Sequence, residues 1–123
     1  MKKNLIVAVI IAAVAVAGYF IFVQASKPGK LDDFAKCLKT NGAIFYGAFW
    51  CPHCQDQKEL FGSSKKHIPY VECSTADSNG QLPACKEAKV NAYPTWAFKD
   101  GSKIEGEVSL QKLAEKTSCV LPE

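Results

Sequence analysis

The sequence predicts one small α/β domain, a mixed β-sheet with helices on both faces, preceded by a single N-terminal transmembrane helix. Three observations lead to this prediction. Residues 5–23 are apolar and uncharged, the later residues alternate between helix-like and strand-like segments, and Asp100-Gly101 has the composition of a tight hairpin turn. Strands joined through helices run parallel, whereas a hairpin adds an antiparallel strand, so the sheet is expected to be mixed.

The N-terminal segment has the composition of a membrane anchor. Residues 5–23 follow Lys2 and Lys3 and would be about 28 Å long as a helix, close to the roughly 30 Å of bilayer hydrocarbon. The two lysines favour a cytoplasmic N-terminus, which places the later residues in the periplasm, a lumen or the cell exterior. A cleaved signal peptide ending at Ala25 is the alternative, but its apolar core would be shorter, at roughly 7–15 residues. We therefore expect an anchor or signal segment at 1–25, a linker at 26–29 and a folded domain at 30–123.

Composition excludes some classes of partner and draws attention to the cysteines. The 123 residues include 15 basic side chains, none of them Arg, and 12 acidic ones, so the chain lacks the residue that binds phosphates in bidentate fashion. Nucleic acid is therefore not expected as a partner. Six cysteines in a small exported domain indicate disulfide chemistry, because disulfides persist outside the cytoplasm.

The first elements of the domain follow from periodicity. Apolar residues recur with helical spacing over residues 30–39 and stop before Asn41-Gly42. Residues 43–50 (AIFYGAFW) form an apolar run of strand length, as in a strand buried on both faces. A helix follows directly, because Pro52 suits a first helical turn and Gly62 ends the run of helix-forming residues.

The later elements are shorter and are separated by polar turns. They are a strand at 68–73, a loop at 74–80, a helix at 82–90, hairpin strands at 95–99 and 103–108, and a helix at 110–117 that Ser109 caps.

Cys51 and Cys54 stand at the junction of the predicted central strand and the helix after it. Free N–H groups and the dipole of that helix favour the thiolate of Cys51, while Cys54 lies one turn inward. We therefore expect a redox-active Cys51–Cys54 disulfide, with Cys51 as the exposed nucleophile and Cys54 as the resolving thiol. Pro52 and His53 set the redox poise. A histidine beside the nucleophile stabilises the reduced form, which makes the pair an oxidant of its substrates.

Other uses of a Cys-x-x-Cys pair have to be weighed against redox chemistry. A structural zinc or copper site would need four ligands, and a second Cys-x-x-Cys motif is missing, so we expect no metal. Thiol–disulfide exchange needs only the sulfurs, so we expect no cofactor. The competing functions are an extracytoplasmic disulfide reductant and a metal-delivery or binding module.

The chain resembles the thioredoxin superfamily over about residues 30–119. The segments that carry the resemblance are Trp50-Cys51-Pro52-His53-Cys54 after a strand, Tyr93-Pro94-Thr95, and the final hairpin and helix. The resemblance implies a cis peptide at Tyr93–Pro94 that faces the cysteine pair, and a Tyr93 backbone that pairs with an extended substrate. Trp50 and Thr95 are then expected at the substrate surface as well.

A narrower resemblance is to the thioredoxin-like domain associated with vitamin K epoxide reductase homologues. Its segments are residues 34–38, 45–58, 60–62 and 93–96. It implies that the domain takes electrons from exported proteins with thiols and passes them to a quinone-reducing membrane oxidoreductase of that type. It also implies the disulfides Cys73–Cys85 and Cys37–Cys119, whereas the residues alone leave three pairings open. Cys73–Cys85 is expected to be structural, with a second redox station as the alternative.

The sequence departs from the thioredoxin pattern at Phe45. Many thioredoxins have a buried acid there, six residues before the nucleophile, which relays the proton of the inner cysteine. The first strand of a full thioredoxin fold also lacks a counterpart, which indicates a minimal sheet of about four strands. Among the remaining residues, we expect Tyr46 and Phe49 to be buried in the sheet, Trp96 in the core and His67 at the surface.

Overall fold

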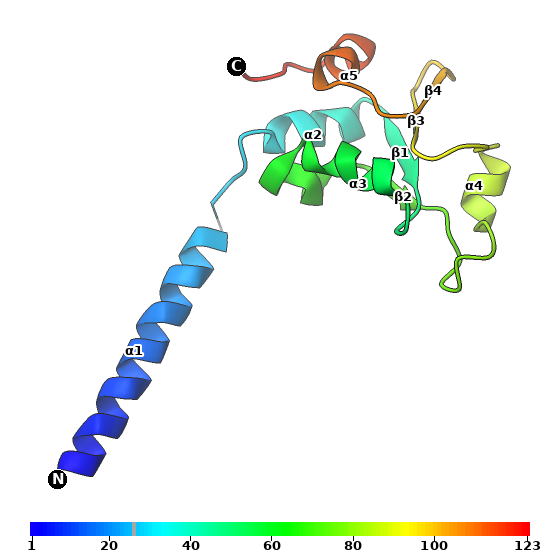
Figure 1. Ribbon diagram of the computed structural model, residues 1–123. Coiled ribbons are helices and arrows are strands. Elements are labelled where there is room, and N and C mark those ends of the chain that lie inside the picture. Colours follow the sequence, from blue (N-terminus) through cyan, green and yellow to red (C-terminus); the bar gives the residue numbers. More distant parts are fainter. Residues whose placement is uncertain (26) are drawn as a thin grey trace.

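The computed structural model describes residues 1–25 and 27–123, and Figure 1 shows a long helix followed by an α/β domain. Helix α1 spans Lys2–Ala25, and none of its residues is buried. Its length and composition make it a candidate membrane span, as the sequence predicts. Residue 26, the first of the predicted linker, lies outside the described residues. The chain reaches the domain at Leu31, whose N–H donates to the Ser64 hydroxyl over 3.1 Å.

The described part of the domain contains four short strands and five helices. The strands are β1 (Ile44–Gly47), β2 (Tyr70–Glu72), β3 (Thr95–Ala97) and β4 (Lys103–Glu105). The helices are α2 (Asp32–Thr40), α3 (Pro52–Glu59), the 3-10 helix η1 (Gly62–His67), α4 (Pro83–Glu87) and α5 (Leu110–Thr117).

The strands form one mixed sheet in the order β2-β1-β3-β4. Strand β1 is parallel to β2 and antiparallel to β3, with Phe45 opposite Tyr70 on one side and Trp96 on the other. Strands β3 and β4 are antiparallel, as expected for a hairpin around Asp100-Gly101. The predicted four-stranded, thioredoxin-like α/β fold is confirmed.

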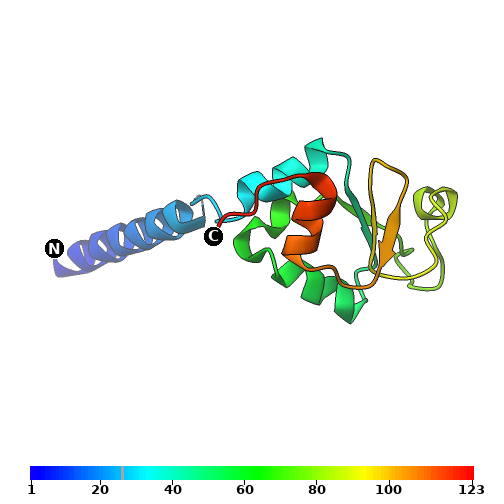
Figure 2. The same ribbon diagram turned by 90° about the horizontal axis from the view of Figure 1, so that it is seen from above.

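Helices lie on both faces of the sheet (Figure 2), and each face buries its own set of side chains. Phe45 and Trp96 stack with their centroids 4.9 Å apart and face α2, α3 and α5, within a core that includes Phe34 and Leu113. Tyr46 points to the other face, where it packs beside α4. This alternation along β1 is the period of a strand, and helices cover both faces as predicted.

Two disulfides join the outer elements to the sheet. Cys37–Cys119 ties α2 to the residues that follow α5, across 82 positions of sequence. Cys73–Cys85 ties the end of β2 to α4 across 12 positions, and neither cysteine is exposed to solvent. These are the pairs that the resemblance to the vitamin K epoxide reductase-linked domain implies.

Several elements differ from the prediction in length or position. Strand β1 ends at Gly47, because the chain then turns and the N–H of Cys51 donates to the carbonyl of Ala48 over 3.1 Å. Phe49 lies in this turn with half of its surface exposed, so the expectation that it is buried in the sheet is wrong. The helix expected at 82–90 covers only Pro83–Glu87, since Lys89 adopts a positive φ of 52°. The residues from Gly62 to His67, for which no element was predicted, form η1.

Candidate active site

Cys51 is the N-cap residue of α3, directly after the turn that ends β1. Its backbone is extended, Pro52 is the first helical residue, and its sulfur accepts a hydrogen bond from the N–H of Cys54 over 3.2 Å. A side-chain acceptor at this position satisfies an N–H group that has no partner within the helix. The helix start thus holds the sulfur of Cys51 where partial positive charge collects.

The two cysteines of the motif are both free thiols, so the structure shows the dithiol form of the predicted Cys51–Cys54 disulfide. Cys54 has no exposed surface and Cys51 is only 3% exposed, which corrects the expectation of an exposed nucleophile. The sulfur of Cys51 is turned toward the helix backbone, and this accounts for the difference. Burial, followed by the hydrogen bond with Cys51, raises the pKa of Cys54 to about 12. Cys54 is therefore the protonated, inner member of the pair near neutral pH.

The proline loop lies beside Trp50, the residue before Cys51. The Tyr93–Pro94 peptide is cis, and Pro94 is fully buried. The rings of Trp50 and Tyr93 meet edge to face with their centroids 6.0 Å apart, which places this loop against the residue before Cys51. Half of the surface of Trp50 is exposed, and a role for these two rings in substrate binding stays a prediction.

Thr95 does not line this surface with its side chain. It is 1% exposed, and its hydroxyl donates to the carbonyl of Ala92 over 2.7 Å. The Thr95 side chain is therefore enclosed, and substrate binding at Thr95 stays a prediction. The reason for the enclosure is its place in β3, where Thr95 pairs with Tyr46 inside the sheet. Its side chain holds the proline loop instead.

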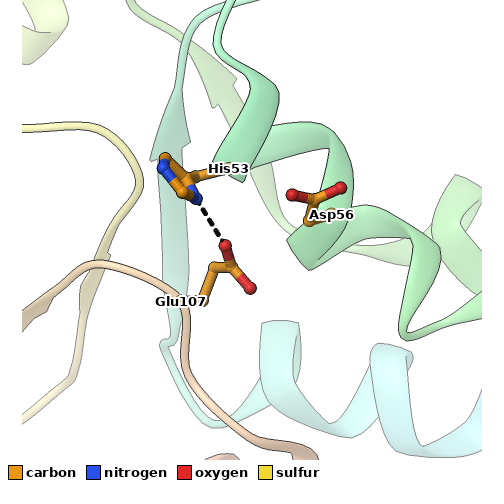
Figure 3. Close-up of side chains that lie close together, drawn as sticks. All are labelled: His53, Asp56 and Glu107. Atoms are coloured by element: carbon orange, nitrogen blue, oxygen red, sulfur yellow. Dashed lines mark hydrogen bonds and ion pairs between the residues drawn. The ribbon is translucent and has the colours of Figure 1, made fainter.

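The side chain of His53 points toward Glu107 (Figure 3). Its Nδ1 lies 2.7 Å from a carboxylate oxygen of Glu107, in the segment between β4 and α5, and both side chains are largely exposed. The sequence places this histidine beside the Cys51 thiolate, but Nδ1 is engaged by Glu107. Together with Asp56, these two residues form the one His, Cys, Asp or Glu group among the described residues that could hold a metal ion, and it contains neither cysteine.

The carboxylate of Glu72 ties the active-site turn to β2. One oxygen accepts the N–H of Ser74 over 2.8 Å and that of Phe49 over 3.3 Å, and the other accepts the Tyr70 hydroxyl over 2.6 Å. The hydroxyl of Ser74 in turn accepts the indole N–H of Trp50 over 2.8 Å. No pattern in the sequence predicted this network. Its signal is that β1 and β2 are parallel, so the residues that follow each strand meet at one edge of the sheet.

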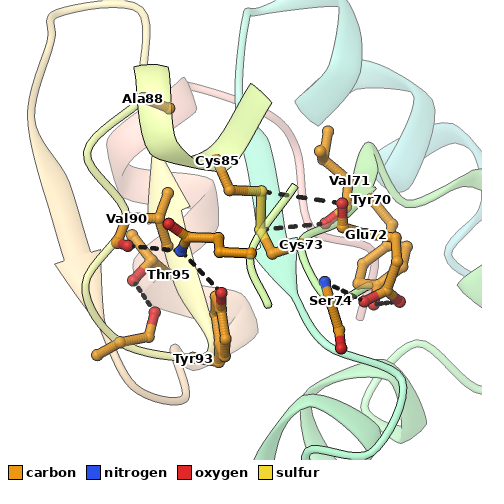
Figure 4. The surroundings of a disulfide bond; sticks show 12 residues. Tyr70, Val71, Glu72, Cys73, Ser74, Cys85, Ala88, Val90, Tyr93 and Thr95 are labelled. Carbon is orange, nitrogen blue, oxygen red and sulfur yellow. Dashed lines mark hydrogen bonds between the residues drawn. A yellow bond between two sulfur atoms is a disulfide. The ribbon is translucent and has the colours of Figure 1, made fainter. Parts of the chain in front are cut away.

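Figure 4 shows Glu72 and Ser74 on either side of Cys73 in the chain, with Cys73 bonded to Cys85. An exchange role for this disulfide would require a thiolate to reach one of its sulfurs in line with the S–S bond. Both cysteines are fully buried, so the arrangement favours the structural interpretation. The disulfide also fixes Cys73, which directly precedes Ser74, the residue that accepts the hydrogen bond from Trp50.

Sheet order, a Cys-x-x-Cys pair at the start of α3 and an adjacent cis-proline together define a thioredoxin-like domain with a dithiol site. The chain is 43% identical over 91 residues to the thiol-disulfide oxidoreductase LTO1 of Arabidopsis thaliana. The matched residues cover 71% of this chain and 24% of that protein. The chain thus spans about a quarter of the length of this relative. No family model matches the sequence.

Solved structures of thioredoxins are also similar to the chain. Mitochondrial thioredoxin 3 from Saccharomyces cerevisiae is 26% identical, with a TM-score of 0.42 and coverage of 72% of this chain and 88% of that one. Thioredoxin O2 from Arabidopsis thaliana is 22% identical, with a TM-score of 0.38 and coverage of 67% and 81%. These names do not bear on a vitamin K epoxide reductase partner, which stays a prediction.

Proposed function

We propose that this chain is a membrane-tethered thiol:disulfide oxidoreductase that oxidises exported proteins through Cys51 and Cys54. Reoxidation is by a quinone-reducing membrane partner of the vitamin K epoxide reductase type. The observation that carries the proposal is the unequal pair at the start of α3, in which Cys51 caps the helix and Cys54 is fully buried. The name of the Arabidopsis relative supports the same chemistry.

Substrate oxidation follows from this geometry in two exchanges. A substrate thiolate attacks Cys51 Sγ of the disulfide form, the Cys51–Cys54 bond breaks, and Cys54 leaves as a thiolate that takes up a proton. A second substrate thiolate then attacks the substrate sulfur of the mixed disulfide and releases the Cys51 thiolate. The substrate gains a disulfide, and the pair holds the two electrons. The helix start stabilises the leaving thiolate of Cys51, which favours this direction.

Reoxidation reverses the roles of the partners. The Cys51 thiolate attacks a disulfide of the membrane protein, and one partner sulfur leaves as a thiolate. Cys54 loses its proton and attacks Cys51 Sγ, which restores the Cys51–Cys54 disulfide and leaves the partner with two electrons for the quinone. The apolar helix α1, a candidate membrane span, would keep this chain in the same membrane as its partner.

The activity is tested on the full chain in detergent. The oxidised protein is mixed with reduced, unfolded ribonuclease A, and the loss of substrate thiols is followed. Cys51→Ser should abolish the reaction, and persistence of the normal rate in that variant would refute the proposal. Equilibration with glutathione then decides the direction. A reduction potential of about −120 mV, as in strong oxidants, supports the proposed oxidation of substrates. A potential of about −270 mV indicates that the chain reduces disulfides instead.

The partner is tested by reconstitution. Vesicles that contain the full chain, a vitamin K epoxide reductase-type membrane protein and a quinone should couple substrate oxidation to quinone reduction. Coupling that persists without Cys51 would exclude this chain as the electron donor.

A further inference from the structure

Cys54 has to become a thiolate in every turnover, although it is completely buried. Its pKa is raised to about 12, first by burial and second by the hydrogen bond with Cys51. The position on β1 where the resemblance places a buried acid is Phe45, whose ring packs against Tyr70 and Trp96. The groups that face Cys54 should therefore show how the chain helps this buried thiol to lose its proton.

Lys58 follows Cys54 by one helical turn on the same side of α3, since residues four apart on a helix are neighbours. Its ammonium lies 3.6 Å from the centroid of the Tyr70 ring, in cation–π contact. Lys58 is half-buried, and its positive charge acts on Cys54 in the direction that lowers the pKa of the thiol. A lysine at an exposed helix position would instead extend into water.

Tyr70 lies next to both Lys58 and Cys54. A side chain at Gly47 would place its Cβ 2.9 Å from the Tyr70 ring and 3.0 Å from Cys54 Sγ, so both approach the same bare stretch of β1. The hydroxyl of Tyr70 donates to Glu72 over 2.6 Å, as Figure 4 shows. Burial and this bond to Glu72 raise the pKa of Tyr70, which keeps the hydroxyl neutral and able to donate. The ring is thereby fixed as a platform for the ammonium.

We infer that Lys58 is a positioning residue for thiol–disulfide exchange: seated on the Tyr70 ring, its ammonium stabilises the thiolate that Cys54 forms when it resolves a mixed disulfide. The inference rests on the proposed function. The titratable groups that face Cys54 are Cys51 and Lys58 from α3 and Tyr70 from β2, with Glu72 behind Tyr70. Lys58 is the cation of this set, and charges in a site with little water interact strongly.

A two-phase reaction isolates the step. The Cys51 thiolate of the reduced full chain attacks dithionitrobenzoate and releases one thionitrobenzoate, which leaves a mixed disulfide on Cys51. Cys54 then gives its proton to solvent base and attacks Cys51 Sγ, which forms the Cys51–Cys54 disulfide and releases the second thionitrobenzoate. Stopped-flow absorbance follows both releases. Absence of the first phase would refute the proposed function, whereas the second phase alone tests Lys58.

Lys58→Met keeps the length of the side chain and removes its charge. An opposite charge a few ångströms away shifts a pKa by about one unit or more, so the second-phase pKa should rise by about one unit. Thiolate becomes about tenfold scarcer but about threefold more nucleophilic, so the second phase at neutral pH should slow roughly threefold. Lys58→Arg keeps the charge and the ring contact and should restore the normal profile. Lys36→Met removes an exposed lysine from a different helix, α2, and should change neither phase.

Tyr70→Leu tests the platform. With Lys58 present but its ring partner gone, the second-phase pKa should move in the same direction as in Lys58→Met, while a thermal melt confirms folding. An unchanged pH profile in Lys58→Met would overturn the inference. A shift in Lys58→Met with none in folded Tyr70→Leu would overturn the role of Tyr70 in positioning the charge.

Discussion

Removal of the Cys73–Cys85 disulfide should cost stability rather than chemistry. The bond closes a loop of 12 positions, for which the chain-entropy model gives about 3 kcal/mol, and both sulfurs are buried. Cys73→Ala/Cys85→Ala removes both thiols together, so no reactive cysteine remains. For a domain of this size, a loss of about 3 kcal/mol lowers Tm by roughly 12–24 °C. Turnover per folded molecule should persist, because Cys51 and Cys54 stay in place.

Thermal melts and ribonuclease oxidation on the same preparation of the full chain check this prediction. The matched control is Cys37→Ala/Cys119→Ala, which opens a closure of 82 positions and should cost more, about 4.5 kcal/mol by the same model. A Cys73→Ala/Cys85→Ala protein with a normal Tm and no electron transfer to the membrane partner would refute the structural role. It would make Cys73–Cys85 a redox relay.

Three further predictions concern the anchor and the inner thiol. Mass spectrometry of the mature protein should find residues 1–25 still attached, and a chain that starts at Ser26 would show a cleaved signal peptide instead. Cys54→Ser should accumulate mixed disulfides between Cys51 and substrates, which non-reducing gels detect; their absence would contradict the resolving role. Because the folded pKa of Cys54 is raised from 9.0 to about 12, the reduced protein should lose stability as pH rises from about 9 toward 12. Urea midpoints at pH 8 and 10.5 measure this loss, and an equal loss in Cys54→Ala would rule out Cys54 as its source.

Local patterns were enough to predict the elements that carry the cysteines. The apolar run before Cys51, Pro52 after it and the Asp100-Gly101 turn are contiguous in sequence, and each has one favoured local conformation. The mixed character of the sheet followed from the rule that strands joined through helices run parallel, whereas a hairpin adds an antiparallel strand. The end of β1 was harder to predict, because apolar residues such as Phe49 extend past the last sheet hydrogen bond into an exposed turn.

Contacts between residues far apart in the sequence could not be predicted from sequence patterns. Glu72 follows an apolar pair in β2 and reads as an ordinary solvent-facing residue, yet it accepts three hydrogen bonds at the active-site edge. Its role depends on the register of β1 against β2, which no short motif encodes. Glu107 likewise meets His53 across 54 positions of sequence, between two exposed side chains that have no periodic pattern.

The two tryptophans occupy such different settings that the chain contains its own optical reporters. Trp50 is half exposed and adjoins Cys51 in the chain, whereas Trp96 is fully enclosed between Phe45 and Phe61. A disulfide quenches a neighbouring indole more strongly than a thiol does, so emission from Trp50 should follow the redox state of the pair. Emission from Trp96 should change only when the core opens. Trp96→Phe would therefore report electron transfer alone and Trp50→Phe would report unfolding alone, each without a label and in real time.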